Sequence, residues 1–326
     1  MSIQLSSSNI FPEDYRGRLA EGATYDARNN TLLWVDIIVG EVHRVYLADL
    51  NKHEVLKWSE PKESIGFIGL TKNPDVVLVC GKSGLAKGDF ASNTIEYFFM
   101  YPLSAREKER LRSNDGIIDP WGHLWIGLMT DFDVSAAEGG VKPEGKLLRI
   151  TSDLQQVDVM LSNTLISNGL AFCNKGTKFY WTDSMDFTIW KFEYNHERNE
   201  LSNKTVFLDT RTIFPGVDDA EPDGMVRTAT GEIYAAVFNT GTIVHVDKQG
   251  NLIEKIHVPA AKTTCVTIGG QGGNELFITT ANEKMDDFDA KIDNAALFGD
   301  LGGFLFRYQA AVDLKGQAQN IWGGDV

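Results

Sequence analysis

The sequence predicts an all-β fold, a six-bladed β-propeller with four-stranded antiparallel blades around a central channel. One observation is a repeat: a short segment, an apolar stretch, a turn and an aromatic-rich strand recur at intervals of roughly 40 to 55 residues. A second is that these segments alternate at period 2, with Gly, Asn and Asp between them. The third is that each unit holds about four such segments, and about six units of four short strands describe a propeller of this kind.

Four copies of the repeat are clear and two are weaker. The clear copies begin at Glu21-Gly22-Ala23, Asn114-Asp115-Gly116, Asn168-Gly169-Leu170 and Asp223-Gly224-Met225. The weaker copies begin near Ile65 and near Cys265. In the first unit, strands are expected at residues 22–25, 31–37, 41–47 and 54–58.

A closed propeller needs all of its blades, so residues 1–326 are expected to form a single domain. The charged segment 103–112 is interpreted as an outer strand or as the lead into the third blade rather than as a helix. The insertion 131–145, rich in Gly, Ala, Ser and Glu, either borders a site or is a plain surface loop. The last dozen residues either close the ring or fray.

Composition narrows the partners and the compartment. A net charge of −14 argues against nucleic acid and anionic membranes as partners, because both are polyanions. No apolar run approaches 18 residues, and the N-terminus lacks a basic start and a long apolar region, so neither a membrane span nor a secretory signal is expected. The cysteines Cys80, Cys173 and Cys265 are far apart, odd in number and set among apolar residues. They are expected to be buried free thiols of a cytoplasmic protein.

The polar residues that open the clear repeats are the candidate functional residues. The first strand of each propeller blade runs beside the channel, so equivalent positions in different blades meet at one height. Glu21, Asn114 or Asp115, Asn168 and Asp223 occupy such positions. Two carboxylates and one or two amide oxygens suit calcium, magnesium or manganese and, less typically, zinc. Asn-Gly and Asp-Gly are also common turn dipeptides, so spacing alone leaves metal site and ordinary turns as open alternatives.

Other catalytic signatures are missing from the sequence. The six histidines show no metal-ligand spacing. There is no Gly-x-Ser-x-Gly segment to support a serine hydrolase, and no phosphate-binding or dinucleotide-binding glycine loop follows a strand. The tryptophans Trp34, Trp125, Trp181 and Trp190 lie in equivalent strands and are expected to form core between blades.

The segment from Arg112 to Gly122, which contains Arg112-Ser113-Asn114-Asp115-Gly116 and Asp119-Pro120-Trp121-Gly122, resembles a known pattern. It is similar to the Arg-x-Asn-Asp-Gly-x-x-Asp-x-x-Gly segment of the SMP-30/gluconolactonase/luciferin-regenerating-enzyme family, which includes regucalcin-like sugar lactonases. Segments around Glu21-Gly22, Asn168-Gly169 and Asp223-Gly224 agree in the same order. The resemblance covers roughly residues 17 to 310.

The resemblance implies one catalytic divalent cation (calcium, magnesium, manganese or zinc) in the channel. It implies that Glu21, Asn168 and Asp223 hold this cation and that Asp223 is also the general base. Arg112 and Asn114 are then expected near the substrate, with Asn114 sometimes close to the metal.

One stretch departs from the pattern of the family. Its sugar lactonases often carry a Glu just after the second strand of the third blade. Here that stretch reads Met129-Thr130-Asp131-Phe132-Asp133, so the shorter carboxylate of Asp131 is assigned to substrate binding.

The resemblance therefore implies a metal-dependent lactonase that opens a small sugar lactone (an aldonolactone) to the sugar acid, acting as a monomer or weak homo-oligomer. One alternative is a related hydrolase of organophosphates or of other esters and lactones, which an apolar rim would favour. Phe132, Phe187 and Phe238 are candidates for such a rim. The other alternative is a non-catalytic calcium-binding propeller. The presence of Arg112 beside the two carboxylates speaks against it.

Overall fold

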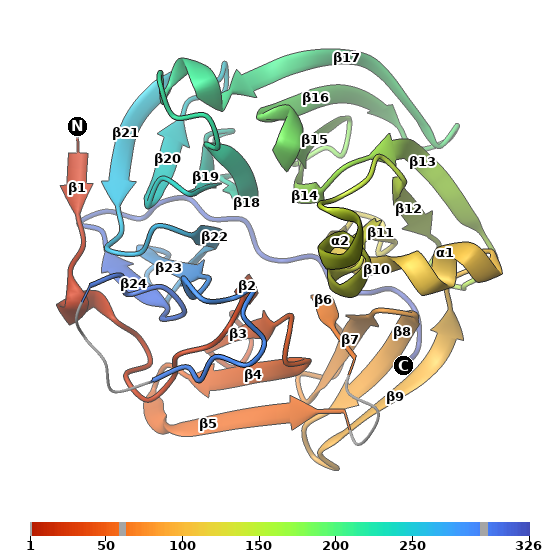
Figure 1. Ribbon diagram of the computed structural model, residues 1–326, viewed down its shortest axis with the longest axis horizontal. Coiled ribbons are helices and arrows are strands. Elements are labelled where there is room, and N and C mark those ends of the chain that lie inside the picture. The colour runs from red at the N-terminus through yellow and green to blue at the C-terminus, as the bar shows by residue number, and fades with distance from the viewer. Residues whose placement is uncertain (1, 59–62, 294–298) are drawn as a thin grey trace.

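The computed structural model, which describes residues 2–58, 63–293 and 299–326, is a six-bladed β-propeller (Figure 1). The first three blades are four-stranded antiparallel sheets. They contain β2 (Ala20–Asp26), β3 (Thr31–Asp36), β4 (Glu41–Tyr46) and β5 (Asp49–Lys57); β6 (Ile65–Leu70), β7 (Val76–Gly81), β8 (Gly84–Asp89) and β9 (Thr94–Met100); and β10 (Leu111–Ile118), β11 (Leu124–Thr130), β12 (Gly145–Ile150) and β13 (Val157–Thr164). The predicted fold class is confirmed, and the strands expected in the first unit match β2 to β5.

The last three blades complete the ring. They contain β14 (Ser167–Phe172), β15 (Lys178–Asp183), β16 (Thr188–Asn195) and β17 (Glu200–Asp209); β18 (Glu221–Arg227), β19 (Ile233–Phe238), β20 (Thr242–Val246) and β21 (Leu252–His257); and β22 (Thr263–Gly269), β23 (Glu275–Thr280) and β24 (Phe306–Gln309). The N-terminal segment ties two of these blades together. Its strand β1 (Ser2–Gln4) pairs in parallel with β21, and Ile10 forms an antiparallel bridge with Phe306.

Each inner strand is interrupted by a β-bulge at nearly the same height. The register shifts lie between Glu21 and Thr24, Ile65 and Phe67, Ser113 and Gly116, Asn168 and Leu170, Pro222 and Met225, and Thr263 and Cys265. A bulge leaves a residue unpaired and re-aims its side chain. The polar-Gly pairs of the repeat therefore lie inside strands beside the channel, and their interpretation as ordinary turn dipeptides is wrong.

The blades pack through aromatic and branched side chains. Trp34, Trp125 and Trp181 are fully buried between sheets, as the sequence predicts. Trp190 is only half-buried, with the ammonium of Lys204 lying 3.9 Å from its ring centroid. Trp190 lies on β16, the third strand of the fourth blade, which is nearer the outer edge of the blade and more exposed to solvent.

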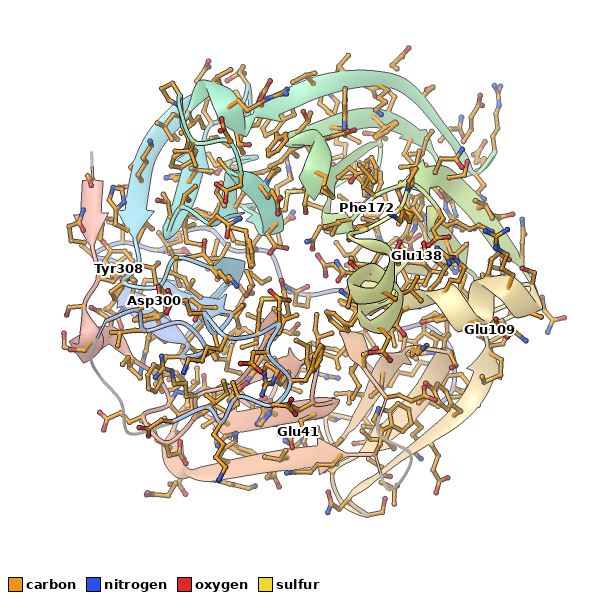
Figure 2. The ribbon with its side chains drawn as sticks, in the orientation of Figure 1. Glu41, Glu109, Glu138, Phe172, Asp300 and Tyr308 are labelled. Carbon is orange, nitrogen blue, oxygen red and sulfur yellow. The ribbon has the colours of Figure 1, made fainter. Side chains whose placement is uncertain are left out.

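Two short helices occur where irregular chain or strand was expected. Helix α1 (Ala105–Arg110) starts with a capping box in which Ser104 and Glu107 bond each other's backbone N–H. The segment 103–112 leads into the third blade, as one of the two alternatives predicted, but the expectation that it is not helical is wrong. Helix α2 (Phe132–Glu138) begins the 131–145 insertion. Glu138, at the end of α2, lies nearer the centre of the ring than Glu109 of α1 (Figure 2). No helix in the described ranges has the length and apolar character needed to cross a bilayer.

The C-terminal segment crosses one end of the channel and does not fray. It bridges Thr228 of the fifth blade at Gly316 and Leu70 of the second blade at Ile321. Trp322 then enters the apolar core with no exposed surface. The segment therefore fastens blades on opposite sides of the ring.

The three cysteines are free, as predicted. Cys80 and Cys265 are buried, whereas Cys173 is half-exposed, so the expectation of burial is wrong for that residue. Cys173 lies in the turn after β14, where its thiol accepts a hydrogen bond from the backbone N–H of Lys178.

Candidate active site

Five of the six candidate residues line one cavity of about 250 Å³, at the end of the channel where the inner strands begin. They are Glu21 on β2, Arg112 and Asn114 on β10, Asn168 on β14 and Asp223 on β18. The structure thus brings together side chains from four blades that are more than 50 residues apart along the chain in each case.

Close approach of the inner strands sets this arrangement. A Cβ atom placed on Gly169 would lie 2.3 Å from the backbone oxygen of Asp223, and one on Gly224 would lie 2.7 Å from the Sγ of Cys265. Only glycine fits at such distances. These glycines let β14, β18 and β22 converge at the bulges, which brings the preceding residues, Asn168 and Asp223, to the channel.

Four carboxylates line the cavity, and two of them, Glu21 and Asp223, are buried and repel each other, whereas Glu221 is partly buried and Asp286 is exposed. Burial, and then the charge of Asp115, raise the pKa of Glu21 to about 8. Burial, followed by the charges of Glu21 and Asp115, raises the pKa of Asp223 well above its ordinary range. Glu21 Oε2 accepts a hydrogen bond of 2.7 Å from the N–H of Gly22, whereas Asp223 Oδ1 is buried without a partner in the described structure. A buried, unpartnered carboxylate oxygen is costly unless a cation or donor occupies the site.

The amide of Asn168 is held in one orientation. Its Nδ2 donates to Ser184 Oγ at 3.2 Å, while Oδ1 accepts only a long bond of 3.3 Å from the N–H of Gly169. Oδ1 is therefore available as an oxygen ligand. Two carboxylates and one amide oxygen fit a hard divalent cation whose coordination is completed by water. In residues 2–58, 63–293 and 299–326 no cluster of three or more His, Cys, Asp or Glu side chains is placed to hold a metal, so the amide is needed.

Arg112 supplies a buried cation beside the carboxylates. Its Nη1 donates to Ser113 O and Asn114 Oδ1, both at 2.9 Å, and its Nε is buried without a partner in the described part of the chain. The guanidinium carbon lies 4.0 Å from the ring centroid of Phe132. Burial lowers the pKa of Arg112 to about 10, which still leaves it charged at neutral pH. Asn114 is fixed in turn, because its Nδ2 donates to Ser167 O at 3.1 Å.

The sixth candidate, Asp131, is not among the residues that line this cavity. Its carboxylate forms a short ion pair with Lys82, and it accepts a bond of 2.8 Å from the N–H of Phe132 at the start of α2. The groups that would bind a sugar hydroxyl are thus already engaged. The 131–145 insertion does border the cavity, through Phe132, Ser135 and Val141.

Two of the three candidate rim phenylalanines, Phe132 and Phe238, line the cavity, whereas Phe187 does not. Phe187 lies beyond β15 with the guanidinium of Arg211 at 5.4 Å from its ring. Sequence reasoning missed Ser184, which orients Asn168, and Met285, which lines the cavity from the chain after β23. The only sequence signal for Met285 is that it is one of two apolar residues, with Phe288, in the otherwise charged stretch 283–289.

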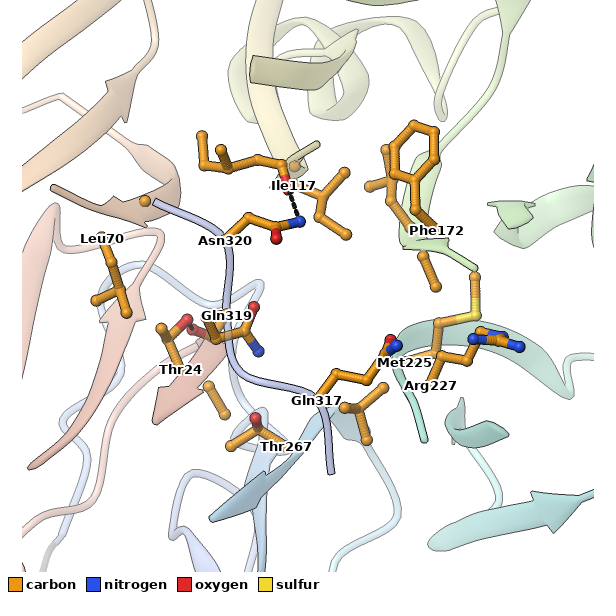
Figure 3. Close-up of a pocket in the computed structure, with 18 of the residues that line it drawn as sticks. Thr24, Leu70, Ile117, Phe172, Met225, Arg227, Thr267, Gln317, Gln319 and Asn320 are labelled. Carbon is orange, nitrogen blue, oxygen red and sulfur yellow. Dashed lines mark hydrogen bonds between the residues drawn. The ribbon is translucent and has the colours of Figure 1, made fainter. Parts of the chain in front are cut away.

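A second cavity, of about 390 Å³, occupies the opposite end of the channel. It is bounded by the far ends of the inner strands and by residues 317–320, which cross it in Figure 3. Asn320 holds this crossing in place by donating to Ile118 O at 2.8 Å. Asp115 lines this cavity, and burial raises its pKa to about 7. Buried polar atoms without a partner in the described residues occur beside both cavities: Asp223 Oδ1 and Arg112 Nε at the smaller one, Arg227 Nε and Thr267 Oγ1 at the larger one. The smaller cavity is the better candidate site, because it brings together Glu21, Asn168 and Asp223.

Fold and cavity together define a class: a six-bladed β-propeller whose channel holds an oxygen-rich acidic cavity beside a buried arginine. The pattern of the SMP-30/Gluconolactonase/LRE-like region matches residues 19–282. The chain therefore belongs to the SMP-30/gluconolactonase/luciferin-regenerating-enzyme family.

Relatives of known sequence and structure support this membership. The cell growth-regulated gene 1 protein of Candida albicans is 57% identical and is covered, like this chain, over 100% of its length. Pentonolactonase XacC of Haloferax volcanii is 29% identical over 90% of this chain and 91% of its own. The calcium-binding protein regucalcin of Agrobacterium tumefaciens has a similar structure, with a TM-score of 0.80, 23% identity and 99% of each chain covered. That last likeness shows the fold.

Proposed function

We propose that this protein is a divalent-metal-dependent lactonase that hydrolyses an aldonolactone to the aldonic acid. The observation that carries the proposal is the pairing, in one cavity, of the Asp223 carboxylate oxygen Oδ1 and the Arg112 Nε–H, both buried and both without a partner among the residues that the structure describes. Family membership and relatives named pentonolactonase and 6-deoxy-6-sulfogluconolactonase support a lactone as substrate.

Glu21, Asn168 and Asp223 would hold the cation, which could be calcium, magnesium, manganese or zinc. The two negative charges of Glu21 and Asp223 would balance the charge of a divalent ion. Neutralisation by the ion would explain why two carboxylates that repel each other are buried together. When bound, the cation would act as a Lewis acid toward the lactone carbonyl, whose oxygen becomes negative as water adds.

The protein's own side chains would perform the remaining steps. Asp223 accepts a proton from the attacking water as its oxygen bonds to the carbonyl carbon. The ring carbon–oxygen bond then breaks, and the proton passes to the departing alkoxide, which gives one hydroxy acid from one lactone and one water. Arg112 donates from Nε to the developing carboxylate, and Asn114 keeps the guanidinium in place through its bond to Nη1.

A second candidate function is hydrolysis of other esters or of organophosphates at the same site. Phe132 and Phe238, which line the cavity, favour it. The same cation would polarise an acyl or phosphoryl oxygen, so the substrate panel decides between the two.

The experiment is a pH-drop assay on sugar lactones, simple lactones, aryl esters and an organophosphate, with protein treated with chelator and checked by elemental analysis. Loss of lactone hydrolysis on chelation, and recovery with calcium, magnesium, manganese or zinc, is expected. Full activity in metal-free protein contradicts the metal-dependent mechanism. Metal binding by calorimetry without turnover of any substrate identifies a non-catalytic calcium-binding propeller instead.

A further inference from the structure

Two polar side chains that line the candidate active site have oxygens without a bonding partner in the described residues. They are Ser135 on α2 and Glu221 at the start of β18. Helix α2 belongs to the third blade and β18 to the fifth, so the two side chains reach the cavity from different blades (Figure 1). Neither belongs to the group proposed to hold the cation, so their oxygens are open to a substrate.

The backbone around Glu221 directs its side chain into the cavity. Pro222 follows it, and a residue before proline is restricted to extended backbone. Residues two apart in an extended chain point to the same side, and Glu221 and Asp223 both line the cavity. The backbone N–H of Glu221 donates to Asp219 O at 2.9 Å. The carboxylate bonds no donor in the described ranges, and burial together with the charge of Asp219 raises its pKa.

The hydroxyl of Ser135 faces the same cavity from α2. Ser135 lies three residues after Phe132, so the two share a face of the helix, and both line the cavity. Main-chain bonds of 2.8 Å hold this turn, because Ser135 N–H donates to Asp131 O and Ser135 O accepts from the N–H of Gly140. In the part of the chain that the structure describes, the hydroxyl itself has no partner. It can therefore both donate to a ligand and accept from one.

A hydroxyl group is the ligand chemistry that suits both side chains. A carboxylate only accepts hydrogen bonds, whereas a serine hydroxyl donates and accepts, and a sugar hydroxyl can meet either. A partly buried carboxylate gains most from such a donor, because hydrogen bonds to charged groups are among the strong ones. A sugar lactone whose ester meets Asp223 and Arg112 would have further hydroxyls to offer to Glu221 and Ser135.

Carboxylates outnumber cationic side chains around the cavity. Its charged lining residues are Glu21, Arg112, Glu221, Asp223 and Asp286. The proposed divalent cation would balance the charges of Glu21 and Asp223. Asp286 is exposed, and the ammonium of Lys262 lies 3.9 Å from it. These pairings leave Glu221 and Arg112 to be considered.

Glu221 keeps an uncompensated charge at the cavity. The carboxylates whose charges act on Arg112 are Asp131 and Glu21 rather than Glu221, and no ion pair involves Glu221 within the described residues. A phosphate, sulfonate or carboxylate on the substrate would therefore be repelled. Two like charges about 6 Å apart, at an effective dielectric constant of about 20, cost on the order of a hundredfold in affinity. An uncharged hydroxyl instead donates to the same carboxylate.

We infer that Glu221 and Ser135 bind hydroxyl groups of the substrate, and that the preferred lactone is an uncharged sugar lactone rather than one that bears a phosphate, sulfonate or carboxylate. The inference rests on the proposed lactonase function and narrows its substrate class. Glu221 accepts a hydrogen bond from one hydroxyl and Ser135 bonds another, while the ester meets Asp223 and Arg112. The cavity of about 250 Å³ gives room for a single sugar ring.

The test compares δ-gluconolactone with 6-phosphoglucono-δ-lactone, which adds a phosphate to the same ring, and with δ-valerolactone, which has a ring of the same size and no hydroxyl. At saturating metal, kcat/KM should be about a hundredfold higher for δ-gluconolactone than for the phosphorylated lactone. If the phosphorylated lactone is an equal or better substrate, the inference is wrong while the lactonase function stands. If no lactone is hydrolysed, the proposed function fails and the inference with it.

Glu221→Gln separates the charge of the phosphate from its size, because it keeps the shape of the side chain and removes its charge. It should narrow the preference for δ-gluconolactone over the phosphorylated lactone from about a hundredfold to about tenfold or less. Glu200→Gln removes the same charge at an exposed position on β17 that does not line the cavity, and it should leave the preference unchanged. A preference that persists in Glu221→Gln would arise from size and would overturn the inference.

Ser135→Ala tests the second hydroxyl contact. It should lower kcat/KM for δ-gluconolactone about fivefold, mainly through KM, and affect δ-valerolactone at least about threefold less, because that lactone has no hydroxyl to bind. Ser202→Ala, at an exposed position on β17, is the matched control and should change neither lactone. Equal losses on both lactones, or no loss on either, would overturn the role inferred for Ser135.

Discussion

Replacing Gly169 by alanine should displace the candidate metal ligands without changing any of them. The new Cβ would lie 2.3 Å from the backbone oxygen of Asp223 and 2.9 Å from Thr182 Oγ1. Ordinary contacts need roughly 3.5 Å, so β14 and β18 must separate by about 1 Å. A shift of about 1 Å at reacting groups costs on the order of 10²-fold in rate. The same overpacking should cost about 1–3 kcal/mol of folding free energy.

The assay measures lactone kcat/KM at saturating metal, together with a thermal melt followed by circular dichroism. Gly272→Ala is the control, because its Cβ would meet only the side-chain amide of Asn274, at 2.8 Å, which can rotate away. Gly169→Ala should lose about 100-fold in activity while remaining folded at assay temperature, and Gly272→Ala should match the parent. Near-parental activity and melting temperature in Gly169→Ala would refute the idea that strand convergence positions the site.

Asp223→Asn should lower kcat by roughly 10² to 10⁴ at saturating metal, whereas Asn114→Ala should lower kcat/KM about tenfold to a hundredfold; the reverse order would put the base elsewhere. Glu41 is partly buried, and although burial opposes it, bonds from His43 and Lys57 lower its pKa from 4.5 to about 2. Its contribution to stability is therefore present above pH 4.5 and lost between about pH 4.5 and 2, so Glu41→Gln should shrink the difference in melting temperature between pH 7 and pH 3. Cys173 should react with a thiol reagent in the folded protein, whereas the buried Cys80 and Cys265 should react only after unfolding. Equally slow reaction of all three thiols in the folded protein would contradict the exposure of Cys173.

Much of the fold could be predicted because each unit of the repeat has a recognisable local pattern of strands and turns. Period-2 strands and short turns recur in every blade, and the first unit matches the structure to within a few residues from β2 to β5. Helix α1 was missed although Ser104 and Glu107 form a recognisable capping box. Its six residues are too few for a helical apolar periodicity, and no side chain of α1 is buried.

The candidate site residues on the inner strands could be predicted from the sequence, whereas the loop residues around them could not. Inner-strand residues of different blades must meet at the channel, so Glu21, Asn168 and Asp223 could be grouped from the repeat alone. Pairing of Asp131 with Lys82 joins residues 49 positions apart through loop geometry, which no spacing rule supplies. Met285 lies in the cavity because Arg18 binds the backbone of segment 284–290. Every residue has a backbone carbonyl, so the sequence does not indicate which carbonyls an arginine will bind.

The weak copies of the repeat separate what the fold needs from what the chemistry needs. In the second blade Ile65 stands where the clear copies have a polar residue, yet Gly66 follows it, and a Cβ there would lie 2.3 Å from Asn114 O. The glycine is thus required by convergence of the inner strands even where no polar residue precedes it. The polar residue is not required by packing, because an isoleucine is accommodated at the same bulge with no exposed surface. Burying Glu21 and Asp223 at such positions therefore costs stability that packing does not return, and the proposed cation would offset this cost by neutralising both carboxylates.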